Sequence, residues 1–194
     1  LPLGCLYLTR ALEQAGYTVD FRDYQLTQAS EPFSTDAILR FLEGAAPVVG
    51  FSCMANLLPF AILAMKEYKK QHPEATLILG GVGSKAVEEQ ILERFPWIDV
   101  IAVGEGERTG PELLAAIRRG DDLTRVAGLV VRGRDGRIVR TPMRERVPDL
   151  DVIPFPAFEH IDLKQYRGYG LMSSRGCPYP CTFCVIGTLG YKAR

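Results

Sequence analysis

The chain has 194 residues, of which 47% are hydrophobic, and its 23 basic and 23 acidic side chains cancel to a net charge of zero. This composition is typical of a globular protein with one domain or slightly more. Zero net charge provides no long-range field that would attract a polyanion. Six arginines between residues 132 and 146 are explained better by a solvated hairpin surface than by a nucleic-acid site. We therefore expect no nucleic-acid partner.

No apolar stretch approaches the ~18–20 residues needed to cross a bilayer, and no secretory signal is present. These features predict a cytoplasmic protein without a membrane span. Five cysteines in such a chain favour metal binding or catalysis over a disulfide framework. The chain begins at Leu1 within a helix-start pattern and stops ten residues after Cys184, so both ends resemble cuts in a longer protein.

From residue 4 to residue 120, helix and strand patterns alternate at short intervals. Residues 17–24 (YTVDFRDY) alternate as a strand does. The apolar runs at 47–53 and 75–81 are typical of parallel strands buried on both faces. Helical patterns separate these strands. The order predicts an α/β domain with a doubly wound parallel sheet, Rossmann-like or flavodoxin-like, and helices on both faces.

Local signals also predict where the helices begin. Pro59 can occupy the first turn of one helix, because a first-turn proline loses no hydrogen bond. Residues 84–95 predict the next helix. Thr109 and Glu112 have the spacing of a capping box at the start of a helix over 111–120.

The first strand of the expected sheet has no counterpart in the pattern, because a helix comes first. In the flavodoxin-like strand order 2-1-3-4-5 that strand would be central. Either an upstream strand lies outside this numbering or the sheet closes in another way.

The pattern changes after residue 120. Residues 126–142 predict a β-hairpin that turns at Asp135-Gly136, a dipeptide suited to a tight primed turn. A proline-rich stretch and one more strand pattern, at 169–177, then lead into three cysteines. The predicted organisation is an α/β domain over 1–120, a hairpin extension over 121–147, a linker over 148–168 and the start of another domain over 169–194.

The three cysteines are Cys177, Cys181 and Cys184, in a C-x-x-x-C-x-x-C arrangement. Thiolates are soft ligands, and three on one tight loop can hold three corners of an iron–sulfur cluster. A structural zinc site would need a fourth ligand, for which His160 is the only nearby candidate and a poor one. Three unrelated buried thiols are the remaining interpretation.

This motif resembles that of the radical S-adenosylmethionine (SAM) superfamily, with Phe183 at its aromatic position. The resemblance implies a 4Fe-4S cluster on Cys177, Cys181 and Cys184, whose fourth iron is chelated by SAM. It also implies reductive cleavage of SAM to methionine and a 5′-deoxyadenosyl radical. Residues 169–177 resemble the first strand of that family's barrel, truncated here.

Glycine-rich loops follow three of the predicted strands, and parallel sheets bind ligands at the carboxyl ends of their strands. The loops contain the sequences GFSCMAN, GGVGSK and GEGER. Glycines allow the backbone to approach a large planar or phosphate-bearing ligand. Each loop alone is equally well explained as a tight turn.

Together the loops resemble the cobalamin-binding domain found upstream of many radical SAM enzymes, whose pattern is D-x-H-x-x-G, then S-x-L, then G-G. Ser52 and Met54 match the second element, with Met54 replacing leucine. Gly80 and Gly81 match the third. Aligning Gly4 with the first element puts Leu1 where the cobalt-ligating histidine would stand. Either cobalamin binds without that histidine ("His-off"), or the domain keeps the fold and has lost the ligand.

The resemblance implies a role for each loop. Ser52 and Met54 would face the corrin or its nucleotide tail. The glycines after the next strand would line the slot for the dimethylbenzimidazole, and the third loop would form its rim. These residues are Gly80, Gly81, Gly83, Gly104, Glu105 and Gly106.

Structural explanations compete with these roles. Met54 could be core, Ser52 a helix cap, and Glu105 with Glu107 a solvated turn. Cys5 and Cys53 are better explained as small buried hydrophobes than as reactive thiols.

The predicted function is the amino-terminal portion of a cobalamin-dependent radical SAM enzyme, similar to methyltransferases or to anaerobic magnesium-protoporphyrin monomethyl ester cyclase. The resemblance implies a small-molecule or peptide substrate and a reductant such as flavodoxin or ferredoxin. We expect this portion alone to be inactive. The alternatives are a non-catalytic cobalamin- or nucleotide-binding module, and a radical SAM enzyme whose front domain is degenerate.

Overall fold

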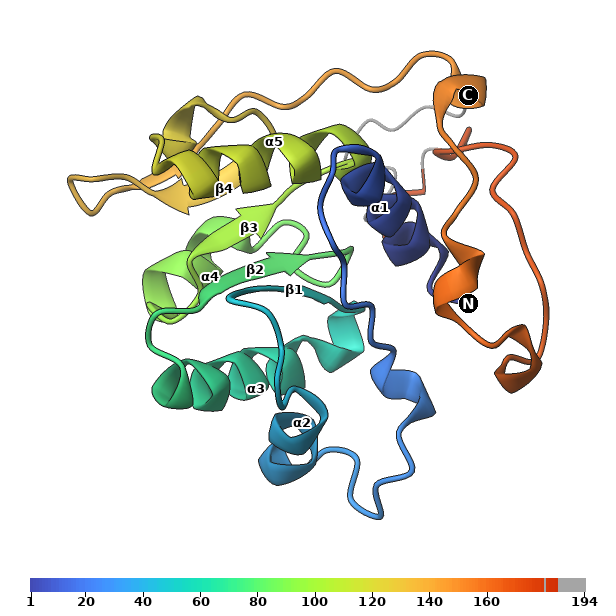
Figure 1. Cartoon of the computed structure of the whole chain (residues 1–194). Helices are drawn as coiled ribbons and strands as arrows, with labels where there is room; N and C mark the ends of the chain where they lie inside the picture. Colours follow the sequence, from blue (N-terminus) through green and yellow to red (C-terminus); the bar gives the residue numbers. More distant parts are fainter. Residues whose placement is uncertain (180, 185–194) are drawn as a thin grey trace.

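The computed structural model describes residues 1–179 and 181–184, which fold around one five-stranded sheet (Figure 1). Its strands lie in the order of the sequence: β1 (Val48–Ser52), β2 (Thr76–Gly80), β3 (Val100–Ala102), β4 (Leu129–Arg132) and β5 (Ile138–Arg140). The first three are parallel, with Val48 opposite Thr76 and Ile78 opposite Val100. β4 and β5 are antiparallel to their neighbours. The α/β prediction is confirmed, but the sheet is mixed, and the predicted hairpin extension is part of the sheet itself.

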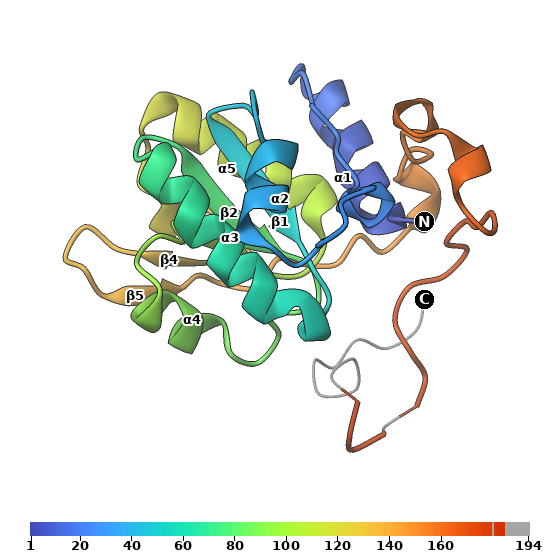
Figure 2. The same ribbon diagram turned by 90° about the horizontal axis from the view of Figure 1, so that it is seen from below.

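The described residues form five α-helices: α1 (Leu3–Gln14), α2 (Thr35–Phe41), α3 (Leu58–Gln71), α4 (Glu88–Arg94) and α5 (Gly106–Arg119). Helices α2, α3 and α4 share one apolar cluster with one face of the sheet, and α5 packs on the other face. Figures 1 and 2 show these two layers. The sheet is therefore covered by helices on both sides, as the alternating pattern predicts.

Side chains of the central strands alternate between the two apolar clusters. Ile101 and Val130 belong to the cluster under α2, α3 and α4, whereas their neighbours Val100 and Leu129 belong to the cluster under α5. This alternation follows from the two-residue period of a strand. All four are almost completely buried. β1 forms one edge of the sheet and is only partly buried, so the prediction that it is buried on both faces is not met.

Helix α1 lies against α5 because α5 presents glycines to it. A Cβ on Gly110 would lie 2.6 Å from Leu8 Cδ1, and a Cβ on Gly106 would lie 3.3 Å from the same atom. The Leu8 side chain therefore packs so close to Gly110 that a larger residue there would force it to move. Gly106, predicted to form the rim of a cofactor slot, contacts another helix.

Residues 17–24 form no strand. The Arg22 guanidinium donates hydrogen bonds to the carbonyl oxygens of Phe41, at 2.6 Å, and Glu43, at 2.9 Å. Residues Tyr24–Leu26 form a 3-10 turn, started by Asp23. The alternating pattern is real, but a strand also requires a neighbouring strand for its ladder. Here side-chain contacts with the end of α2 replace that ladder.

Several predicted boundaries also change. α5 begins at Gly106, so Thr109 lies inside the helix and caps nothing. Pro59 stands in the first turn of α3, as predicted. The helix predicted over 84–95 begins only at Glu88, because Ala86 has a positive φ of 69°. Such backbone does not continue a right-handed helix.

The hairpin turn is longer than predicted. Gly136 N–H donates to Gly133 C=O at 2.9 Å, and Gly133 N–H donates to Arg137 C=O at 2.8 Å. Gly136 has a φ of 80°, but the φ of Asp135 is not positive. A type I′ turn requires a positive φ at both central residues. The loop is therefore a type I turn followed by a left-handed glycine.

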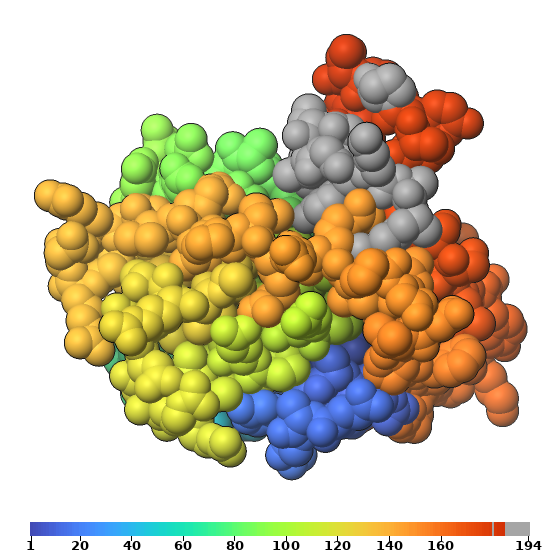
Figure 3. Space-filling model, turned by 90° about the horizontal axis from the view of Figure 1, so that it is seen from above, coloured from blue at the N-terminus to red at the C-terminus, as the bar shows by residue number. Residues whose placement is uncertain are grey.

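The segment after β5 crosses the molecule toward the N-terminal helix α1, orange beside blue in Figure 3. Its described residues contain three 3-10 turns, Leu150–Val152, Phe158–His160 and Leu163–Gln165. Ala157 N–H donates to the Leu6 carbonyl oxygen at 3.1 Å, which ties this segment to α1. Residues 169–177, predicted as a strand, form none, because no strand among the described residues pairs with them. None of the helices in the described part of the chain is long and apolar enough to cross a bilayer.

Candidate cofactor site

The loops after β1 and β2 meet at the carboxyl edge of the parallel strands. Gly83 N–H donates to the Cys53 carbonyl oxygen at 2.9 Å, and Cys53 N–H donates to Gly80 C=O at 3.5 Å. A Cβ on Gly81 would lie 2.9 Å from Ser52 Oγ. The two sequence elements that resemble a cobalamin pattern, Ser52 with Met54 and the glycine pair, are thus brought into direct contact.

These glycines are required by the packing of one loop on the other. A Cβ on Gly83 would lie 2.8 Å from the Cys53 carbonyl oxygen, and Gly81 has a φ of 81°. Real Cβ atoms do not approach backbone that closely, and L side chains rarely adopt that φ. A Cβ on Gly80 would lie 3.9 Å from its nearest neighbour, the Phe51 carbonyl oxygen. Gly81 and Gly83 hold the loops together, and their role toward a ligand stays a prediction.

Two apolar side chains are exposed at this edge. Met54 is 59% exposed and Val82 is 37% exposed, so Met54 does not belong to the core. Ser52 is exposed and caps no helix, since α3 and the short turn before it lack a side-chain cap. A polar hydroxyl beside exposed apolar side chains fits a large, mostly apolar planar cofactor with polar edges.

The first turn of α1 reaches the same edge. Gly4 is exposed there, and the Ser52 side chain lies near the Cys5 thiol. Burial raises the pKa of the Cys5 thiol, which the Ser52 side chain lowers in part, and burial likewise raises that of Cys53. Both thiols therefore stay protonated at neutral pH and are poor nucleophiles, but they are only partly buried and not the buried hydrophobes that were predicted.

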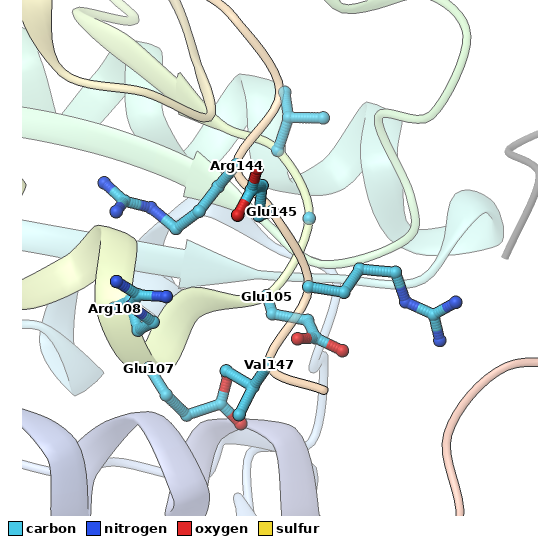
Figure 4. A pocket seen from close by; sticks show the side chains of 9 residues that line it. Glu105, Glu107, Arg108, Arg144, Glu145 and Val147 are labelled. Carbon is cyan, nitrogen blue, oxygen red and sulfur yellow. The ribbon is translucent and has the colours of Figure 1, made fainter. Parts of the chain in front are cut away.

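The loop after β3 carries the acidic residues of the site. Gly104 has φ 90°, and Glu105 and Glu107 follow it at the start of α5. With Arg108, Arg144 and Glu145 they line a small pocket, and Figure 4 shows their side chains. Neither glutamate belongs to a solvated turn, because 22% and 12% of their side chains are exposed.

Arg175 pairs with both of these glutamates, and sequence analysis did not identify it. Its guanidinium donates to Glu107 Oε1, and Nη1 lies 3.6 Å from Glu105 Oε1. The partners lie about 70 residues earlier in the chain, so no local pattern could have revealed them. Arg175 stands two residues before Cys177.

Cys177 and Cys184 are partly buried, Cys181 is exposed, and all three thiols are free. Cys184 N–H donates to the Cys181 carbonyl oxygen at 3.1 Å, so these residues form a turn. Phe183 is 91% exposed. Three accessible thiolates on one loop suit the donor set of an iron–sulfur cluster. Pro180 and residues 185–194 lie outside the described residues.

The metal-capable groups that the structure does bring together lie elsewhere. Among the described residues, Glu13, Glu159 and His160 are the one set of three whose ligand atoms all lie within 4.8 Å of one another. The three cysteines form no such set. His160 Nε2 lies 2.5 Å from Glu13 Oε1, a partner 147 residues away that sequence analysis missed. His160 is therefore engaged with α1, which weakens the zinc alternative.

The chain's first 114 residues match the family model of the B12 binding domain. The chain therefore belongs to the B12-binding domain family, which supports cobalamin as a cofactor. Its more specific resemblance, to cobalamin-binding radical SAM proteins, is confirmed by individual relatives and a solved structure.

One relative is the anaerobic magnesium-protoporphyrin IX monomethyl ester cyclase of Synechocystis, 32% identical over all of this chain and 39% of the relative. The cobalamin-dependent radical SAM methyltransferase TokK of Streptomyces tokunonensis is 33% identical over 73% of this chain and 22% of its own length. The solved structure of the cobalamin-dependent S-adenosylmethionine radical enzyme OxsB, with aqua-cobalamin and S-adenosylmethionine bound, has a TM-score of 0.74 and 25% identity, over 95% of this chain and 26% of that one. This chain thus spans two fifths or less of these proteins.

Proposed function

We propose that this chain is the cobalamin-carrying portion of a radical SAM enzyme, together with the loop that ligates its iron–sulfur cluster. One contact carries the proposal: Arg175, next to the cysteine motif, pairs with Glu105 and Glu107 in the loop that follows β3. This contact supports a single site in which the three cysteines and the B12-binding edge belong together. The match to the B12-binding domain supports the cobalamin half.

Each group of residues has a defined task in this proposal. Cys177, Cys181 and Cys184 would hold a 4Fe-4S cluster and leave one iron open for the amino and carboxylate groups of SAM. Ser52 and Met54 would contact cobalamin. The bound groups would supply reductive cleavage of SAM to a 5′-deoxyadenosyl radical and a cobalt centre that can carry a methyl group.

Cobalamin would be held without a histidine ligand from this chain's pattern, since Leu1 stands at the matching position. The loops after β1 and β2 would therefore hold cobalamin through packing and hydrogen bonds alone. We propose a cytoplasmic enzyme with a small-molecule or peptide substrate and flavodoxin or ferredoxin as its reductant. The reaction on the substrate would be methyl transfer or cyclisation.

Cobalamin binding is tested on the purified chain. Hydroxocobalamin is added, excess ligand is removed by desalting, and the corrin absorbance that stays with the protein is measured. We expect retention near one equivalent. A colourless protein would favour a degenerate front domain.

The cluster is tested separately, by anaerobic reconstitution with iron and sulfide. We expect about four irons per chain and an absorbance that is lost in Cys181→Ala and kept in Cys53→Ala, the matched control outside the motif. Stable binding of one zinc in place of iron would contradict the cluster assignment. Because the rest of the relatives' length lies outside this chain, we expect neither sample to turn over SAM by itself.

A further inference from the structure

Arg175 is a mostly buried cation delivered by the segment that carries the cysteines. Only 13% of its side chain is exposed. Its Nη2 donates to Glu107, its Nη1 lies 3.6 Å from Glu105, and its Cζ lies 5.3 Å from the centroid of the Tyr7 ring. Arg175 therefore contacts three elements at once: α1, the loop after β3 and the first turn of α5.

The acceptors are suited to hold this cation. Glu107 lies in the first turn of α5, where the helix dipole favours negative charge. The guanidinium is a planar fork that meets carboxylates with defined geometry. A buried charge without a partner is unfavourable. Once Arg175 has docked on its two carboxylates, the segment that carries it is therefore more stable there than in another position.

The site of docking matters for the cofactors. Glu105 and Glu107 stand one and three residues after Gly104, at the carboxyl edge of β3, and β3 pairs in parallel with β2, whose following loop meets the loop after β1. We propose that Arg175 is a positioning residue, whose ion pairs with Glu105 and Glu107 fix where the cysteine loop lies relative to the B12-binding edge. The inference rests on the proposed function, because the loop's position matters to chemistry only if both cofactors bind.

The docking itself is tested without cofactors. Spin labels are attached through non-natural amino acids at positions 87 and 179, both exposed, and the distance distribution between them is measured by pulsed electron resonance. We expect one narrow distribution in the parent chain. Arg175→Gln and Glu107→Gln should each widen it at least about twofold, because the hydrogen bond that Arg146 Nη2 donates to the carbonyl oxygen of residue 175, at 3.5 Å, is too long to hold the segment by itself.

Matched variants separate this role from general damage. Glu112→Gln removes the ion pair with Arg144 from the same helix without touching the cysteine segment, and should leave the distribution unchanged. Arg175→Lys keeps the charge and should give an intermediate width. Circular dichroism checks that all variants stay folded. An unchanged width in folded Arg175→Gln would overturn the proposal.

The effect of Arg175 on the distance between the two cofactors is measured in the reconstituted chain. Reduced cluster and cob(II)alamin are both paramagnetic, so the cluster shortens the relaxation time of the cobalt signal when the two are close. We expect that shortening to be lost in Arg175→Gln while both cofactors still bind, and full shortening would again contradict the proposal. Failure of the parent chain to bind cobalamin or iron would instead refute the proposed function, while the label distances still decide the docking.

Discussion

Gly83 donates its backbone N–H to the Cys53 carbonyl oxygen at 2.9 Å, and a Cβ on Gly83 would lie 2.8 Å from that same oxygen. The loop after β2 is therefore held against the loop after β1 at a distance that no larger residue permits. Because both loops form the proposed B12-binding edge, their contact connects stability with cofactor binding.

Gly83→Ala should destabilise the fold by about 1–3 kcal/mol, because the added methyl group forces rigid backbone apart. It should also reduce the cobalamin retained after desalting. Urea denaturation measures the first effect and corrin absorbance the second. Gly80→Ala is the matched control for stability, since its Cβ would have its nearest contact at 3.9 Å. Equal stability of the two variants would refute this role for Gly83.

The packing of α1 on α5 gives a second prediction. Gly110→Val should cost about 1–3 kcal/mol of stability, because its side chain would overlap Leu8. Leu8→Ala in the same chain should recover part of that loss by making room. The four chains of this double-mutant cycle are compared by urea denaturation. Strict additivity of the two single effects would show that the side chains do not meet.

Asp99 joins β2 to α3 and gives a third prediction. Its Oδ2 accepts hydrogen bonds from Leu77 N–H, at 2.7 Å, and from Lys69 Nζ, at 2.9 Å. Asp99→Ala should cost about 1–3 kcal/mol, because it leaves the Leu77 amide without its acceptor. Asp99→Asn keeps an acceptor and loses mainly a partly exposed ion pair, so it should cost less, about 0–1 kcal/mol. A thermal or urea transition that ranks the two variants in the opposite order would contradict this assignment.

The Tyr166 hydroxyl, which donates to Asp23 Oδ2 at 2.6 Å, makes stability depend on pH. Burial, and then the hydrogen bond and charge of Asp23, raise the pKa of Tyr166. Because the folded-state pKa exceeds the unfolded one of about 10, the contribution is complete below about pH 10 and disappears as the pH rises through the folded value.

Tyr166→Phe should therefore lose about 1 kcal/mol at pH 7, a modest value because solvent screens the pair. The difference from the parent chain should shrink as the pH rises above 10. Urea midpoints measured between pH 7 and 11 test this trend. A difference that grows with pH would mean that the sign is wrong.

Much of the fold could be predicted because its signals are local. Buried strands such as β2 appear as apolar runs, and Pro59 marks the start of α3. The pattern at 17–24 was misleading, because alternation reports which side chains are half-buried and says nothing about a neighbouring strand. The capping box at Thr109 failed for a related reason: its Oγ1 accepts a hydrogen bond from Arg144 Nε at 3.0 Å, a residue 35 positions away.

The candidate site shows the same division. The motif spacing predicted a cluster on Cys177, Cys181 and Cys184, and the loop sequences predicted cofactor contacts at Ser52 and Gly81; these roles stay predictions. Arg175 and the contact of His160 with Glu13 could not be found, because their partners are brought near only by folding.

The sequence by itself determined the class of fold, the order of most of its elements and the spacing of the thiols, since these follow from short-range periodicity and from ligand chemistry within a few residues. Only the tertiary structure decided that the hairpin completes the sheet, that Gly106 accommodates Leu8, and that Arg175 docks on Glu105 and Glu107. Each of those depends on residues far apart in the chain, whose contact is selected by the packing and charge balance of the whole fold.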